Sequence, residues 1–106
     1  MTRAVTIRPD AEAEFEAAAV WYEKQRAGLG LQFLVAVDRA IQHVRTWPHT
    51  GVPVEGLASD LDVRRLAVSK FPYHVAYMAN DDAVHILAVA HDHRRPGYWR
   101  HRTGSA

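Results

Sequence analysis

The stretch Val84-His85-Ile86-Leu87-Ala88-Val89-Ala90-His91 is the most apolar strand-like run of the chain. A short apolar run next to turn residues is typical of a strand that is buried on both faces. Asn80-Asp81-Asp82 precedes it and has the short polar side chains of a tight turn. Before that turn, residues 74–78 alternate between apolar and polar. These features predict a central strand at 84–91 that pairs antiparallel with a strand at 74–78.

Further from the central run, two more segments have strand patterns. Residues 63–68 predict a strand before the central pair, and the alternation of residues 3–8 predicts a short first strand. The segment 48–61 contains two prolines and two glycines, so we expect an irregular loop there.

Two helical patterns lie between the first strand and this loop. Residues 10–25 place apolar side chains on one helical face, and Asp10 is a candidate N-cap. Gly28-Leu29-Gly30 interrupts the pattern, and a second helix then runs to Trp47-Pro48, where proline disfavours helical backbone. So short a break predicts an antiparallel helical hairpin.

The predicted order is therefore β-α-α-β-β-β, an α+β fold with an antiparallel sheet and the helical hairpin packed on one face. A chain of 106 residues corresponds to one domain, residues 1–106, and we expect residues 103–106 to be frayed.

Composition limits the possible functions. The chain has no cysteine, which excludes disulfides and cysteine-based metal sites or nucleophiles. No apolar run approaches the ~18 residues of a membrane span, and no secretory signal is visible, so we expect a cytoplasmic protein with no membrane partner.

Charge is distributed unevenly along the chain. Residues 63–106 hold seven Lys and Arg against three Asp and Glu, whereas residues 1–62 hold six against nine. A basic second half favours an acidic protein or a polyanion as partner. The alternative is a solvated surface with no partner.

The densest functional pattern is the end of the chain, residues 91–102, with the sequence HDHRRPGYWRHR. Its cations can hold phosphate, its imidazoles can transfer protons near neutral pH, and its aromatic rings can stack on bases. His91 is a candidate for proton transfer or a hydrogen-bonded structural residue. His91 and His93 lack a third ligand at a metal-site spacing, so we expect neither a metal nor a cofactor. We expect Trp99 to pack the tail on the core, and Tyr98 is open to either role.

Arg64 and Arg65 must point to opposite faces of a regular strand. Either one could bind phosphate, or form a structural ion pair with an acid such as Asp10 or Glu14. We expect the remaining aromatic residues, those of the helical region, to lie in the core. These are Phe15, Trp21, Tyr22, Phe33 and Trp47.

Taken together, these residues resemble the RelE/ParE superfamily of toxins from bacterial type II toxin–antitoxin modules. The resemblance runs from Ile7 to Arg102. The pieces that carry it are Trp21-Tyr22-Glu23, Gly28-Leu29-Gly30 with Phe33, Trp47-Pro48, Val63-Arg64-Arg65, Phe71-Pro72-Tyr73 with Val75 and Tyr77, Val89-Ala90-His91, and the closing Arg94-Arg95-Pro96-Gly97-Tyr98-Trp99-Arg100-His101-Arg102. The closing run is similar to the C-terminal tail of the ParE-like members of the superfamily. The β-α-α-β-β-β fold of the family agrees with the order predicted above.

The resemblance implies a growth-inhibiting toxin that a cognate antitoxin silences in a hetero-oligomer. RelE-like members cleave messenger RNA in the ribosome, whereas ParE-like members are described as poisoning DNA gyrase. RelE-like members carry lysines and arginines after the second helix, but residues 48–61 here contain none. The loss of one electrostatic donor costs about 10²–10³ in rate, so we favour the ParE side.

Two sets of site residues follow from this interpretation. The candidates for binding the target or the antitoxin are Arg64, Arg65, Arg94, Arg95, Tyr98, Trp99 and Arg100. If the protein is a nuclease, the candidate catalytic residues are Arg64, Arg65, His91, Arg95 and Tyr98. A third possibility is a non-toxic module that only binds an antitoxin.

Overall fold

The computed structural model describes residues 3–56, 62–95 and 97–104. The elements are β1 (Ala4–Ile7), α1 (Pro9–Gln25), α2 (Leu29–Thr46), β2 (Val52–Pro53), β3 (Val63–Ala67), β4 (Tyr73–Ala79), β5 (Ala83–His91) and a 3-10 helix (Arg100–Gly104). The predicted order of strands and helices is confirmed, with one short strand added. Residues 57–61 of the predicted loop and residues 105–106 of the predicted frayed end lie outside the described residues.

The strands form one mixed sheet in the order β1-β5-β4-β3-β2. The predicted meander of β3, β4 and β5 is antiparallel, and the side chain of Asn80 closes its β4–β5 turn by accepting hydrogen bonds from the amides of Asp82 and Ala83, at 2.8 Å each. β1 differs, because it adds to the free edge of β5 in a parallel register. β2 also differs from the predicted loop, since it pairs antiparallel with β3.

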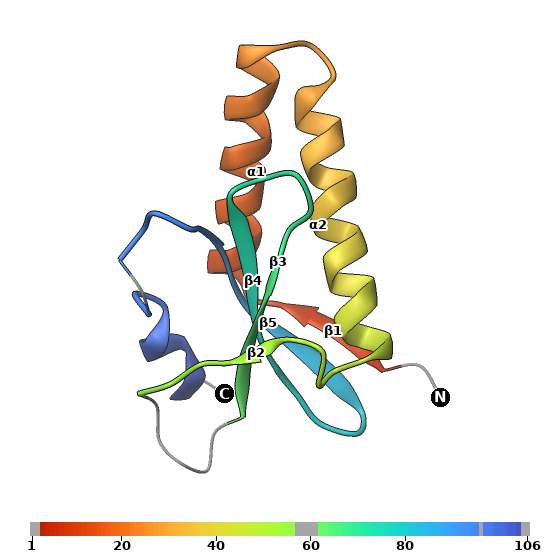
Figure 1. Ribbon diagram of the computed structural model, residues 1–106, viewed down its shortest axis with the longest axis vertical. Coiled ribbons are helices and arrows are strands. Elements are labelled where there is room, and N and C mark those ends of the chain that lie inside the picture. The colour runs from red at the N-terminus through yellow and green to blue at the C-terminus, as the bar shows by residue number, and fades with distance from the viewer. Residues whose placement is uncertain (1–2, 57–61, 96, 105–106) are drawn as a thin grey trace.

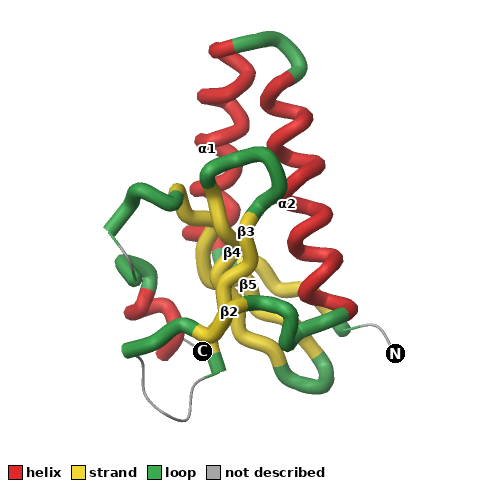
Figure 2. The backbone as a smooth tube through the Cα atoms, viewed as in Figure 1, coloured by secondary structure: helices red, strands yellow, loops and turns green. Residues whose placement is uncertain are grey.

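The helices form an antiparallel hairpin that packs on one face of the sheet, and the C-terminal tail lies along the other face (Figure 1). The tip of the hairpin projects beyond the sheet along the long axis of the molecule. Figure 2 shows the short helix of the tail beside the strands. Within the described residues, no helix has the length and apolar character that a membrane span requires.

The start of α1 corrects the predicted N-cap. Arg8 occupies the N-cap in extended backbone, and Pro9 takes the first helical position. Proline suits that position because its φ is fixed near the helical value and the helix leaves that N–H unpaired. Asp10 therefore lies in the first turn, where its negative charge interacts favourably with the helix dipole. Its carboxylate also pairs with Arg8 at 3.4 Å.

β5 is buried on both faces, as its apolar run predicts. On the hairpin side, Val84, Ile86 and Val89 join the main core with Phe33 of α2. On the tail side, Leu87, Ala88 and Ala90 form a second cluster that includes Trp99. The tail is thus needed to cover the second face of the strand.

The prediction that all the helical-region aromatics are core residues is wrong for two tryptophans. Phe33 is buried and Phe15 and Tyr22 pack against the core, but Trp21 is 57% exposed and Trp47 is 62% exposed. Trp21 neighbours Tyr22 on α1, and only one of two adjacent helical residues can point to the same face. Trp47 caps the end of α2, beyond its packed face.

Tyr77 fixes the segment that leads into β2. Its buried hydroxyl donates to the carbonyl of Pro48 at 2.7 Å and accepts from the amide of Gly51 at 3.0 Å. A side chain at Gly51 would collide with this hydroxyl, since an added Cβ would lie 2.7 Å from it. Tyr77 therefore holds β2 beside β3 and sets one wall of the site described next.

Candidate functional site

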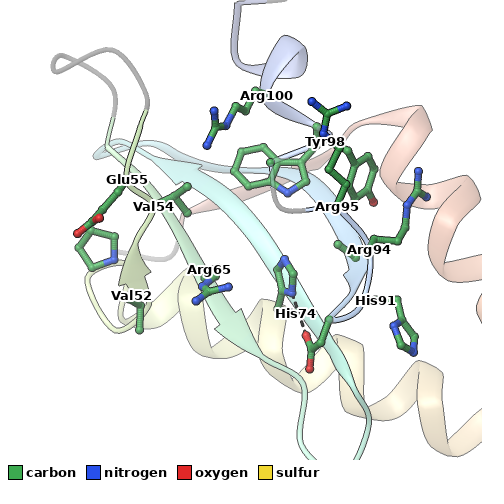
Figure 3. Close-up of a pocket in the computed structure, with 15 residues that line it drawn as sticks. Val52, Val54, Glu55, Arg65, His74, His91, Arg94, Arg95, Tyr98 and Arg100 are labelled. Atoms are coloured by element: carbon green, nitrogen blue, oxygen red, sulfur yellow. Dashed lines mark hydrogen bonds and ion pairs between the residues drawn. The ribbon is translucent and has the colours of Figure 1, made fainter.

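A cleft of about 360 Å³ opens between β2, β3 and β4 on one side and the end of β5 with the tail on the other. Figure 3 shows Arg65 and His74 on the neighbouring strands β3 and β4, below the tail that carries Arg95, Tyr98 and Arg100. Seven residues singled out from the sequence line this cleft. They are Arg65, His91, Arg94, Arg95, Tyr98, Trp99 and Arg100.

Arg64 and Arg65 point to opposite faces of β3, as expected. Arg65 is exposed and lines the cleft. Arg64 turns to the other face, where it pairs with Asp62 at 3.1 Å and donates to the carbonyls of His49 and Gly51. Neither arginine pairs with Asp10 or Glu14, because those carboxylates face the arginines of the N-terminus and the tail.

Glu14 of α1 is the main anchor of the tail. Its carboxylate accepts hydrogen bonds from the Tyr98 hydroxyl, from the Arg102 guanidinium at 3.0 and 3.3 Å, and from the Val89 amide of β5 at 3.2 Å. Arg102 is only 8% exposed and also donates to the carbonyl of Leu87 at 2.9 Å. This cluster joins the first helix, the central strand and the end of the chain.

From the sequence, Glu14 was named only as a possible partner of Arg64 or Arg65, and Arg102 only as part of the closing run, so their pairing was missed. They are 88 positions apart, and no local pattern connects an acid on a helix with an arginine in a tail. The available signal was the position of Glu14 beside the apolar face of its helix, where an acid needs a buried partner.

Tyr98 acts as a hydrogen-bond donor in this arrangement. Burial, together with the hydrogen bond to Glu14, raises the pKa of the Tyr98 phenol well above its usual range. The guanidinium of Arg94 lies 3.7 Å from the centre of the Tyr98 ring and 3.8 Å from a Glu14 oxygen. Tyr98 therefore stays protonated, and Arg94 is partly committed to the same cluster.

Within the cleft, the cations left for a partner are Arg65, Arg95 and Arg100. All three are exposed in the cleft, and none forms an ion pair with another described residue. Gly97 lets the chain pass close to Arg100, since an added Cβ would lie 2.3 Å from its Nε. Trp99 is 2% exposed, which confirms that it packs the tail on the core and supports the cleft from beneath.

The cleft also holds a pair that sequence reasoning missed. His74 Nδ1 lies 3.0 Å from a carboxylate oxygen of Asp92, and both residues line the cleft. A carboxylate that orients an imidazole is an arrangement suited to proton transfer. The polar face of β4 could have pointed to His74. His91, in contrast, accepts a hydrogen bond from the His93 amide at 3.0 Å through Nδ1 and contacts the ring of Tyr73.

No group of three or more metal-ligating side chains occurs among residues 3–56, 62–95 and 97–104. What the cleft offers chemically is a cationic surface with one imidazole–carboxylate pair. In the described part of the chain, four arginines line it against two carboxylates, Glu55 and Asp92.

Comparison with known proteins identifies a family. The family model described as "ParE toxin of type II toxin-antitoxin system, parDE" matches residues 5–96. Among solved structures, the chain is similar to "Chromosomal ParDE TA system from P. aeruginosa", at 13% identity and a TM-score of 0.69, over 85% of this chain and 96% of that chain. This second likeness is one of fold. The curated proteins gave no match.

Replacement of Glu14 tests its role as the anchor. Glu14→Ala leaves the buried Arg102 guanidinium without its main partner, so we expect the free energy of unfolding to fall by about 3 kcal/mol. Glu16→Ala, on the exposed side of the same helix, is the control and should change stability by less than about 0.5 kcal/mol. Urea denaturation followed by circular dichroism measures both. Equal stabilities of the two variants would contradict the assignment.

Proposed function

The chain belongs to the ParE toxin family of type II toxin–antitoxin systems, and we propose that it inhibits cell growth by poisoning DNA gyrase in the cytoplasm. We further propose that a cognate antitoxin neutralises it in a hetero-oligomeric complex. The observation that supports this proposal is the cleft lined by the exposed cations Arg65, Arg95 and Arg100. Such a surface attracts an acidic segment of a partner.

For the residues that the sequence analysis named as nuclease candidates, the geometry favours a binding role over a catalytic one. A tyrosine that serves as a general base must lose its proton, but the hydroxyl of Tyr98 donates to Glu14 and its pKa is raised. The wall formed by residues 52–55 is apolar apart from Glu55, so it brings no cation to a phosphate. The developing charge of RNA cleavage would lack stabilisation on that side.

One observation favours the second candidate function, a ribosome-dependent messenger RNA endonuclease. His74 and Asp92 face the cleft close to Arg65, and together they could move a proton beside a bound phosphate. The catalytic candidate in that case is His74, a residue on β4 that the sequence-based set did not contain.

A purified-component assay separates the two functions. We expect the protein to inhibit gyrase supercoiling and to leave message intact in a translating extract. Arg65→Ala with Arg95→Ala should weaken the inhibition about tenfold or more, whereas His74→Ala should preserve it. Lys24→Ala, which removes an exposed cation of α1 outside the cleft, is the matched control.

Two results would count against this function. Codon-positioned cleavage of message that His74→Ala abolishes would assign the protein to the endonuclease class. If induced expression leaves growth unaffected, the chain is a non-toxic antitoxin-binding module.

Capture of the antitoxin should depend on salt. Family antitoxins are commonly acidic and partly disordered, so the cleft cations should steer association. With the proposed cognate antitoxin, Arg95→Ala combined with Arg100→Ala should slow association about tenfold at low salt, and the difference should shrink as salt rises. Stopped-flow fluorescence measures these rates. Rates that do not respond to salt would contradict the steering role.

A further inference from the structure

A second surface, which we call the hairpin groove, is separate from the cleft. It is a groove of about 530 Å³ between α2 and the turn that joins β3 to β4. Among the residues that the structure describes, none lines both the groove and the cleft. In Figure 1 the β3–β4 turn reaches up beside the hairpin at the end of the sheet, and the tip of the hairpin continues beyond it.

The floor of the hairpin groove is apolar. Leu31 and Val35 are one helical turn apart on α2 and are 66% and 41% exposed, and Phe71 of the β3–β4 turn lies beside them. Large aliphatic side chains exposed next to each other in a groove are typical of a surface that binds a partner. Neither Leu31 nor Val35 is part of a core cluster of the chain.

The rim of the groove is cationic. Arg26, Arg39 and Lys70 line it, and its described lining residues include no acidic side chain. This is notable because residues 1–62 have more acids than bases, nine against six. The N-terminal amides of α2 are not free to bind an anion there, since the carboxylate of Glu23 accepts from the amides of Gly28 and Gly30.

The backbone conformation of Lys70 is a separate indication that the groove has a function. Its φ of 71° makes it the only residue other than glycine with a positive φ within the described ranges. Glycine or asparagine adopts this left-handed backbone more readily. A lysine there costs local stability, so its charged side chain is best explained by a use at the groove.

We propose that the hairpin groove binds an acidic amphipathic helix of a partner protein. The apolar side of that helix would cover Leu31 and Val35, and its carboxylates would meet Arg26, Arg39 and Lys70. The proposal rests on the proposed function only in that the chain acts through protein partners.

The positive charge of the rim argues against a second copy of the chain as the occupant of the groove. A two-fold symmetric dimer through the groove would bring each cationic rim against another. The apolar floor also argues against nucleic acid, whose phosphates would match the cations but leave Leu31 and Val35 in water.

The test uses the full chain and two synthetic helical peptides, each about four turns long. Both peptides have leucines along one face. One carries glutamates on its other faces and the second carries lysines. We expect the glutamate peptide to bind with a Kd of roughly 10–100 µM and the lysine peptide not to bind. NMR shift changes should centre on Leu31, Val35 and Phe71.

Three variants check the residues that carry the proposal. Leu31→Ser should weaken binding about tenfold, and its control Val20→Ser, an exposed residue of α1 outside the groove, should not. Arg39→Glu should also weaken binding about tenfold. Lys70→Gly should stabilise the fold by relieving the backbone and yet weaken peptide binding, a combination that a purely structural Lys70 would not produce.

Several results would overturn the proposal. They are the absence of saturable binding, equal binding of the two peptides, shift changes centred on the cleft, and dimerisation or vesicle binding that Leu31→Ser abolishes. This test is independent of the gyrase assay. Failed peptide binding with intact gyrase inhibition overturns only the groove proposal, and the reverse result overturns only the proposed function.

Discussion

The ion pair between Glu14 and Arg102 is the interaction on which the rest of the molecule depends. Arg102 is 8% exposed, and a charge this buried is tolerated only when a partner compensates it. Glu14 supplies that partner from the first helix while it also binds Tyr98 and the amide of Val89. One carboxylate thus fixes the end of the chain on the central strand. That fixed tail covers the second face of β5, so the apolar residues on that face, Leu87, Ala88 and Ala90, are shielded from water.

Glu14 also influences which cations of the second half of the chain remain for a partner. Seven lysines and arginines lie in residues 63–106, but they are not equivalent. Arg102 and Arg64 are used within the fold, and Arg94 is shared with Glu14 and the Tyr98 ring. The positive charge that the cleft offers to a partner is therefore concentrated on Arg65, Arg95 and Arg100, whereas Lys70 lies at the hairpin groove. A net charge counted from the sequence overstates the charge that a partner meets.

Local patterns predicted most of the fold. The apolar run at 84–91, the Asn80 turn and the glycine break at Gly28 each depend on neighbouring residues, so they are visible in the sequence. Two features could not be predicted, because they depend on distant parts of the chain. They are the parallel register of β1 on β5 and the pairing of β2 with β3.

The candidate site was likewise predicted only in part. The cations and aromatics of residues 91–102 were predicted as a cluster, and most of them do line one cleft. His74 was missed, and Glu14 was considered only as a partner of Arg64 or Arg65, because their roles arise only when β4 and the helix meet the tail. Trp21 and Trp47 were assigned to the core because tryptophan is usually buried, but Trp21 lies on the outer side of α1 and Trp47 follows the last residue of α2.

The most direct measurement of the central anchor is the titration of the Tyr98 ring, followed by NMR in the wild-type protein and in Glu14→Gln. Burial and the hydrogen bond to Glu14 raise the pKa of Tyr98. In the folded wild-type protein Tyr98 should therefore stay protonated as the pH rises past 10, the ordinary value for tyrosine. Glu14→Gln should lower this pKa. A Tyr98 that ionises near pH 10 in the folded wild-type protein, with no change in Glu14→Gln, would contradict the account.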